Sequence, residues 1–349
     1  MKAFIPIFLL SVTSVLSIVS VYRNPTRGRA ALIFSGLLVV GIVIATAAGR
    51  NLFDSIRILS YMIFFVAPFY LLMCAFLLRA NRGDAKAALV SSMVIAGIGV
   101  YAFWIEPFWL ETSYVQVHSK RLTQPVRIVV LADIQTDRVG RYERAALLRA
   151  AQEKPSLILL PGDFIQERRS KRRAELFEQL REAFREAGLD RVAGVAVGGD
   201  HDPVEWPMLF DEFETVKFVE TGSVDIGELH ITALSLDDSA NPILEINPSD
   251  KFHIVVGHRP DFALSAQLPA ELLVAGHTHG GQVRLPFIGP LITYSAVPRS
   301  WAAGVTQLQE SKTLSVSRGI GMERDLAPRL RFLCRPQIVV IDLIPAGVN

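Results

Sequence analysis

The 349-residue sequence has only two cysteines, and charged residues make up no more than 20% of it. Cys74 lies inside an apolar run and Cys334 near the end of the chain, so the dense disulfide framework of a small secreted domain is excluded. Soluble domains carry about a quarter charged residues, and disordered chains are poor in hydrophobic ones. With 50% hydrophobic residues, the chain is not disordered, and membrane segments are expected.

The few charges are unevenly distributed along the chain. Residues 1–110 hold nine Lys or Arg and three Asp or Glu, nearly all of them between long apolar runs, whereas the remainder holds 27 basic and 31 acidic residues. The net charge of +2 is therefore the sum of two unlike halves. It gives no indication of a nucleic-acid partner, and none is expected.

Four stretches without any charged side chain lie in the first part of the sequence: residues 3–21, 30–48, 58–78 and 87–105. Each is close to the roughly 20 residues that a helix needs to cross the hydrocarbon core. Only a helix satisfies all of its own backbone polar groups in lipid, so four transmembrane helices are predicted. A cleaved signal peptide is the alternative for the first stretch. It is opposed by the absence of a clear cleavage site and by the three further apolar stretches.

Basic residues between the stretches predict an orientation. The first connection carries three basic residues, the third carries three beside one aspartate, and the second carries two beside one aspartate. Counting positive charge places the first and third connections in the cytoplasm, and hence both chain ends outside it. No charged residue lies within a span, which argues against a transporter or channel.

The sequence changes character at about residue 119, where short β-rich runs begin to alternate with polar helical patterns. We expect a transmembrane region over residues 1–110, a linker over 111–124 and an α/β domain over 125–345. The candidate strands are nearly continuous apolar runs, typical of strands buried on both faces: residues 126–131, 156–160, 192–197, 253–256 and 272–275. Helical patterns cover residues 143–153 and 172–187, the second ending before Gly188.

Each of these five strands runs directly into a polar cluster. The clusters contain Asp133 and Gln135, then Asp163, then Asp200, His201 and Asp202, then His258, and last His277 and His279. Open α/β folds place their sites at this end of the strands. Carboxylates and imidazoles that converge there need cations between them, and together they suit Zn²⁺, Mn²⁺ or Fe²⁺. One such cluster alone is weak, because a single Gly-Asp is usually a turn; five in succession are a strong signal.

The order of the clusters resembles that of the calcineurin-like metallophosphoesterases, whose pattern is Asp-x-His, Gly-Asp, Gly-Asn-His-Asp/Glu, His and Gly-His-x-His. The resemblance covers residues 126–343. It is closest to a membrane-anchored bacterial subgroup, through GHTHGGQVRLP at 276–286, SRGIG at 317–321 and RPQIVVIDL at 335–343. It implies an α/β/β/α sandwich with two metal ions at the sheet edge, phosphoester or anhydride hydrolysis, and a multi-pass protein of the bacterial inner membrane.

The resemblance also implies a role for each polar residue. Asp133, Gln135 and His279 would hold the first metal, Asp163 would bridge both metals, Asp200, His258 and His277 would hold the second, and His201 would be the acid. Simple chemistry agrees with this division. Two ions can hold a hydroxide and neutralise a phosphoryl group. The bridging ligand must be a carboxylate, because imidazole offers a metal only one lone pair.

Two positions depart from the family pattern. Gln135 stands where the family has histidine, and Asp200 where it has asparagine. Both changes move the ligand set from nitrogen towards oxygen, and the second adds a negative charge. Mn²⁺ or Mg²⁺ should therefore be favoured over Zn²⁺ or Fe²⁺, and turnover at neutral pH should be lower. The alternative is a catalytically degenerate metal-binding or signalling domain of the same fold.

Basic residues near the clusters suggest how a substrate could be held. Arg259 and Arg318 are candidate phosphate ligands, and a structural ion pair is the alternative for each. A basic run at 168–173 is typical of a solvated surface, or close to a bilayer could attract anionic headgroups. The expected partners are the lipid bilayer and a phosphorylated, lipid-linked substrate.

Overall fold

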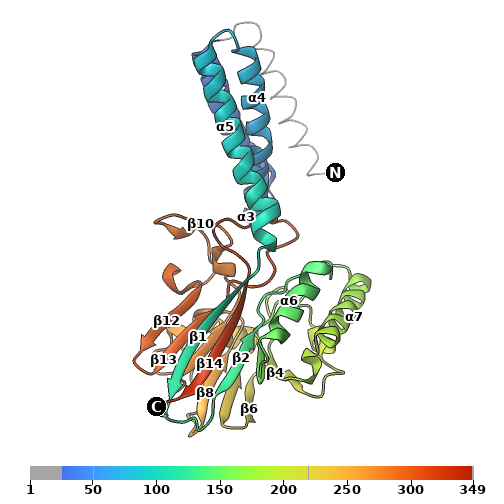
Figure 1. The fold of residues 1–349 in the computed structure, drawn as a ribbon, viewed down its shortest axis with the longest axis vertical. Helices are drawn as coiled ribbons and strands as arrows, with labels where there is room; N and C mark the ends of the chain where they lie inside the picture. Colours follow the sequence, from blue (N-terminus) through green and yellow to red (C-terminus); the bar gives the residue numbers. More distant parts are fainter. Residues whose placement is uncertain (1–25, 50, 219, 348–349) are drawn as a thin grey trace. The chain divides into compact units, whose positions relative to one another are not determined.

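The computed structural model describes residues 26–49, 51–218 and 220–347 (Figure 1). The chain divides into two compact units. One comprises residues 1–105 with 325–329, and the other residues 106–324 with 330–349. Each unit is described by itself below.

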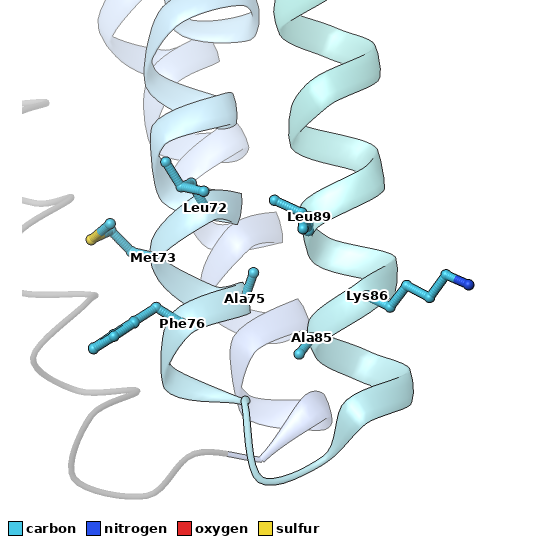
Figure 2. Close-up of a pocket in the computed structure, with 7 residues that line it drawn as sticks. All are labelled: Leu72, Met73, Ala75, Phe76, Ala85, Lys86 and Leu89. Atoms are coloured by element: carbon cyan, nitrogen blue, oxygen red, sulfur yellow. The ribbon is translucent and has the colours of Figure 1, made fainter.

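The first unit is helical. Its described elements are α2 (Arg27–Ala48), α3 (Leu52–Tyr61), η1 (Met62–Val66), α4 (Ala67–Leu77), α5 (Arg82–Val100) and η2 (Tyr101–Ile105). A groove between α4 and α5 is lined by apolar side chains such as Leu72 and Leu89, and by Lys86, whose amino end points away from α4 (Figure 2). On α4, Phe69 and Phe76 are exposed, whereas Tyr70 and Cys74 are buried.

Two continuous helices, Leu52–Leu77 and Arg82–Phe108, are long and apolar enough to cross a membrane by length and composition. They correspond to the predicted spans at 58–78 and 87–105. The span predicted at 30–48 forms α2, whose apolar part is the shorter stretch Ile33–Val43, and the one at 3–21 lies outside the described residues. Among the described helices, two rather than four therefore qualify as candidate spans.

The second unit is built around two six-stranded sheets. The first has the order β1 (Glu111–Ser119), β14 (Gln337–Pro345), β2 (Val126–Val130), β3 (Leu157–Leu160), β4 (Ala193–Ala196) and β5 (Val216–Phe218). The second has the order β12 (Gly304–Gln309), β13 (Lys312–Val316), β9 (Leu272–Ala275), β8 (Phe252–Val256), β7 (Leu229–Ala233) and β6 (Gly222–Ile226). Strands β2, β3 and β4 are parallel, as are β7, β8 and β9.

The remaining elements connect or cover these sheets. They are η3 (Glu106–Phe108), α6 (Arg141–Gln152), α7 (Ser170–Ala187), η4 (Leu189–Arg191), η5 (Trp206–Leu209), α8 (Leu236–Ser239), η6 (Pro260–Leu264), η7 (His279–Gly281) and η8 (Arg299–Trp301), with the hairpin β10 (Arg284–Leu285) and β11 (Gly289–Pro290). The first long helix, α6, follows β2, and α7 follows β3. They lie together beside the first sheet (Figure 1).

The core explains why the central strands are apolar throughout. Ile128 and Val130 of β2 pack with Ile254 of β8 in a cluster between the two sheets. Val129, from the same strand, faces the other way into a cluster with side chains of α6 and α7. Successive residues of a strand point to opposite faces, so β2 is buried on both. A third cluster covers the outer face of the second sheet, where Phe262 of η6 packs. The layers form the expected α/β/β/α sandwich, with only short helices on that outer face.

All five predicted strands form, and the helix predicted at 172–187 ends where Gly188 adopts φ 73°. The prediction of a linker over residues 111–124 is wrong for most of that range. Residues 111–119 form β1, which pairs in parallel with β14 along its whole length. Only Val115 and Val117 of this edge strand are buried, so it lacks the continuous apolar run of the central strands.

Candidate metal centre

The five polar clusters meet at the carboxyl ends of β2, β3, β4, β8 and β9. Three groups of side chains there bring ligand atoms within 4.8 Å of one another: Asp133 with Asp163 and His258, Asp163 with Asp200 and His201, and Asp200 with His258 and His277. Asp163 and His258 each belong to two groups, so the groups are continuous. Residues that lie up to 144 positions apart in the sequence therefore form one site, as the sheet topology predicts.

The backbone at this site is unusual. Asp133, Gln135, Asp163, His277 and His279 all have positive φ, between 38° and 68°. Such conformations cost a non-glycine residue of the order of 1 kcal/mol or more and gather at functional sites. Gly199 is required for a related reason, because a Cβ there would lie 2.1 Å from Asp163 Oδ1. These backbone conformations allow the side chains of neighbouring turns to converge on one site.

Three of the predicted ligands share one property. Asp133 Oδ2, Gln135 Oε1 and His279 Nε2 are buried, and none has a hydrogen-bond partner among the described residues. A buried polar atom without a partner costs about 1–3 kcal/mol, and unpaired atoms of this kind are rare in folded proteins. Two oxygens and a nitrogen left open in this way are the donor set expected for a divalent cation. The residues predicted for the first metal therefore fit it.

The two histidines predicted for the second metal are oriented by carbonyl groups. His258 Nδ1 donates to Pro161 O at 2.7 Å, and His277 Nε2 donates to Tyr294 O at 3.0 Å. The other ring nitrogen of each histidine lies near Asp200 Oδ1, at 2.9 and 3.4 Å respectively. A carbonyl that holds one N–H of a neutral imidazole leaves the second nitrogen available to a metal; without metal, His258 Nε2 instead donates to Asp200 Oδ1.

Asp163 lies between the two sets of ligands. Its Oδ2 is 3.6 Å from His258 Nε2, and its Oδ1 accepts a hydrogen bond from the His201 backbone N–H at 2.9 Å. Asp202 holds the same turn, because its Oδ2 accepts the N–H groups of Asp163 and Gly199 at 2.7 and 2.9 Å. The position of Asp163 is thus the one that a shared ligand needs.

The loop of the SRGIG motif closes over this site. Gly319 has φ 73°, and a Cβ there would lie 2.7 Å from Asp133 Cβ. The loop is held by Arg331, which is completely buried and donates to Arg318 O at 2.7 Å and to Gly321 O at 3.1 Å. The motif therefore allows close backbone approach to two first-metal ligands.

His201 has two neighbours that sequence reasoning missed. Its Nε2 lies 3.0 Å from Glu323 Oε2, and its Nδ1 lies 3.1 Å from Gln166 Nε2. Burial would lower the pKa of His201, but the hydrogen bond to Glu323 and the negative charge of Asp163 outweigh burial and raise it. Because the Gln166 amide N–H faces Nδ1, the proton of the ring is favoured on Nε2. The raised pKa of His201 means that this proton is retained at neutral pH.

The structure pairs both candidate substrate-binding arginines within the domain. Arg259 donates to Tyr294 O at 2.9 Å and lies 3.5 Å from Asp261, and Arg318 pairs with Glu111 at 2.9 Å. In the basic run, Arg169, Arg172 and Arg173 pair with Glu167, Glu175 and Glu205. Structural ion pairs, the alternative for the two arginines, are thus present, and a contact with substrate stays a prediction.

Burial of so many acids leaves charge that a cation would balance. Burial raises the pKa of Asp133 to about 6 and that of Asp163 well above its usual range. Burial also opposes ionisation of Asp200, but its hydrogen bonds to His258 and His277 outweigh burial and lower its pKa. Without metal, the protons on Asp133 and Asp163 partly take the place of cations.

We expect the stabilisation by Mn²⁺ to increase as the pH rises from about 5 to about 7. The raised pKa of Asp133 stabilises the metal-free fold fully below the unfolded value near 3.8, and this contribution is lost as the pH passes about 6. Bound metal replaces the proton and avoids this loss; at 100 times Kd it adds about 2.7 kcal/mol. Thermal unfolding of the full chain, followed by tryptophan fluorescence with Mn²⁺ or with chelator, measures the difference.

The matched control is Asp342→Asn, because Asp342 pairs with Arg127 rather than with the site. This variant should keep the metal-dependent shift in Tm at every pH. A shift that is equal at pH 5 and pH 7 in the unmodified protein would contradict the expectation.

Comparison with known proteins shows which family the chain is similar to. Residues 126–281 match the family of calcineurin-like phosphoesterases. The chain is 29% identical to the uncharacterized metallophosphoesterase YkuE of Bacillus subtilis (strain 168), over 73% of this chain and 93% of that protein. It is 25% identical to the phosphodiesterase YaeI of Escherichia coli (strain K12), over 76% of this chain and 99% of that protein. A dimetal phosphatase from Danio rerio aligns with TM-score 0.35 and 11% identity, over 56% of this chain and 88% of that one.

The second unit thus contains a calcineurin-like metallophosphoesterase domain. The family implies a metal-dependent phosphoester hydrolase and typically binds two divalent metal ions. The clusters of carboxylates and histidines described above are its candidate ligands.

Proposed function

We propose that this chain is a membrane-anchored phosphohydrolase that cleaves a phosphate ester or diphosphate in a lipid-linked substrate, with His201 as the acid. The observation that carries the catalytic part is the set of open ligand atoms on Asp133, Gln135 and His279, which have no partner among the described residues. Buried polar atoms are rarely left without a partner, and a bound ion is one explanation when they are. The three open atoms therefore support a working centre.

The contacts support the following ligand assignment. Asp133, Gln135 and His279 would hold the first ion, Asp200, His258 and His277 the second, and Asp163 both. Two bound divalent ions would supply an activated hydroxide and neutralise the charge that builds on the phosphoryl oxygens. The oxygen-rich set favours Mn²⁺ or Mg²⁺, with Zn²⁺ or Fe²⁺ as weaker candidates.

The chain's own residues supply the remaining chemistry. When the bond from phosphorus to the leaving oxygen breaks, that oxygen gains negative charge and needs a proton. His201 holds its Nε2 proton beside Glu323, and its backbone N–H fixes the residue against Asp163. A positioned acid of this kind typically contributes 10²–10⁴-fold.

The membrane part of the proposal is supported by two apolar helices and by chain connectivity. Arg82–Phe108 is the second helix long enough to cross a bilayer, and β1 begins at Glu111, so two residues join them. A domain tethered so closely encounters bilayer-borne phosphates more often than soluble ones. From the loop charges of the sequence, we propose that the domain faces the extracytoplasmic side of the inner membrane.

The test is hydrolysis of a bis-aryl phosphodiester, and of a phospholipid in mixed micelles, by the purified full chain. We expect Mn²⁺-dependent release of phenol, its loss on chelation, and about two bound ions per chain. The control is His230→Ala. His230 lies on β7 and pairs with Asp225 on β6, and neither residue contacts the site. Two bound ions without hydrolysis of either substrate, or fewer ions and no hydrolysis, would instead favour the degenerate binding domain.

A further inference from the structure

Glu323 lies at the centre of a hydrogen-bond network beside the metal centre. Its side chain is only 12% exposed. One oxygen, Oε1, accepts from Gln166 Nε2 at 2.7 Å, and the other, Oε2, accepts from Gln135 Nε2 at 3.1 Å and contacts His201 Nε2 at 3.0 Å. One carboxylate thus touches a predicted ligand of the first metal and the predicted acid.

The network fixes which way the Gln135 amide points. Gln166 Oε1 is an acceptor, because the Arg324 backbone N–H donates to it at 2.7 Å. Gln135 Nε2 donates to that oxygen at 3.2 Å and to Glu323. If the Gln135 amide turned over, its oxygen would face the Glu323 carboxylate and be repelled. Gln135 Oε1 is therefore directed to the opposite side, where it is buried and has no partner among the described residues.

This orientation matters because glutamine is a poorer ligand than the histidine usual at this position. An amide can present either oxygen or nitrogen, and only the oxygen binds a divalent ion. A side chain that holds a ligand in its binding orientation is typically worth 10–100-fold in metal affinity or activity. Holding Gln135 by its nitrogen makes its oxygen available without any rearrangement.

We propose that Glu323 is a positioning residue that fixes Gln135 as an oxygen ligand of the first metal and holds the proton-bearing nitrogen of His201. The second role rests on the proposed function, whereas the first depends on metal binding alone. One acidic residue thereby adapts the site to the replacement of histidine by Gln135. It also couples occupancy of the first metal to the placement of the acid.

The metal arm of the test is a Mn²⁺ titration of the full chain carrying Glu323→Gln, with bound metal measured by elemental analysis. The substitution keeps the shape of the side chain but removes the charge that orients Gln135. We expect affinity at one of the two sites to fall about 10–100-fold, so that at limiting Mn²⁺ the variant holds about one ion. The matched control is Glu310→Gln, which lies in the exposed turn between β12 and β13 and should bind like the unmodified chain.

Gln135→His in the Glu323→Gln background separates the two roles. A histidine needs no carboxylate to expose a ligand atom, so two ions should bind again. The acid still lacks its partner, so kcat should stay about 10-fold or more below that of Gln135→His alone. KM should be unchanged, because a residue that acts only through His201 and Gln135 makes no substrate contact of its own. If Glu323→Gln only damaged the structure, adding Gln135→His would not restore the binding of two ions while leaving kcat low.

Glu323→Gln with two tightly bound ions and unchanged kcat would overturn the proposal. If that variant does not fold, Glu323→Asp is the substitute. It keeps the charge but moves the charge away from Gln135 by one methylene, and it should weaken one metal site in the same way. A Mn²⁺ titration equal to that of the unmodified chain would again overturn the proposal. An unmodified chain that binds two ions but hydrolyses nothing would contradict the proposed function, while the metal titration would still decide the role of Glu323 towards Gln135.

Discussion

Replacing Asp163 with asparagine is expected to lower kcat by at least about 10³-fold and to reduce bound Mn²⁺ below two ions per chain. Asp163 shares one group with Asp133, a predicted first-site ligand, and another with Asp200, a predicted second-site ligand. A neutral amide cannot be shared by two cations as a carboxylate is. Metal ions contribute several kcal/mol of transition-state stabilisation, and about 4 kcal/mol corresponds to 10³-fold.

The substitution tests charge rather than folding, because asparagine keeps the shape of the side chain. Its carbonyl oxygen can still accept the His201 backbone N–H that now bonds to Asp163 Oδ1 at 2.9 Å. Asp225→Asn is the control, since Asp225 pairs with Lys251 and His230 at the far edge of the second sheet. If the variant kept activity within tenfold of the unmodified chain and still bound two ions, the assignment of Asp163 as the bridging ligand would be wrong.

Most of the site could be predicted because its signals are local in the sequence. Each ligand follows directly after a buried apolar strand, and parallel strands bring their carboxyl ends to one edge. Asp133, Asp163 and His258 therefore converge although they are far apart along the chain. Glu323 and Gln166 could not be found in this way. Gln166 lies three residues beyond Asp163 and Glu323 follows the SRGIG loop, so their contacts with His201 depend on how two loops fold back.

The elements that were missed are those with weak periodic patterns. Strand β1 is an edge strand with two buried valines, and β12 alternates between partly buried and exposed residues. The start of one candidate membrane helix was placed too late for a different reason. Charged residues at 54 and 57 suggested a loop, but Asp54 and Arg57 pair with each other within α3, and Asn51 caps the helix by accepting the Asp54 N–H. Local ion pairing lets the helix begin at Leu52.

Replacing His201 with alanine is expected to lower kcat while two Mn²⁺ ions remain bound, and the loss should depend on the leaving group. His201 lies in one candidate group with Asp163 and Asp200 but is assigned the acid role, and its Nε2 lies 3.0 Å from Glu323 Oε2. An alkoxide needs a proton as it departs, whereas an acidic phenolate does not. We expect a loss near 10⁴-fold for an alkyl ester and near 10²-fold or less for an aryl ester, within the range of general acid catalysis.

Steady-state kinetics on a matched pair of aryl and alkyl diesters, with metal content measured on the same samples, makes this comparison. His253→Ala is a suitable control, because His253 is buried at the other end of β8 and bonds to Thr232 and Pro269. An equal loss on both esters would assign His201 to binding the phosphoryl group rather than to protonating the leaving oxygen. Loss of a metal ion in the variant would instead make it a ligand. Dependence on the leaving group with both ions retained is the result that only an acid gives, since neither binding nor ligation distinguishes the two esters.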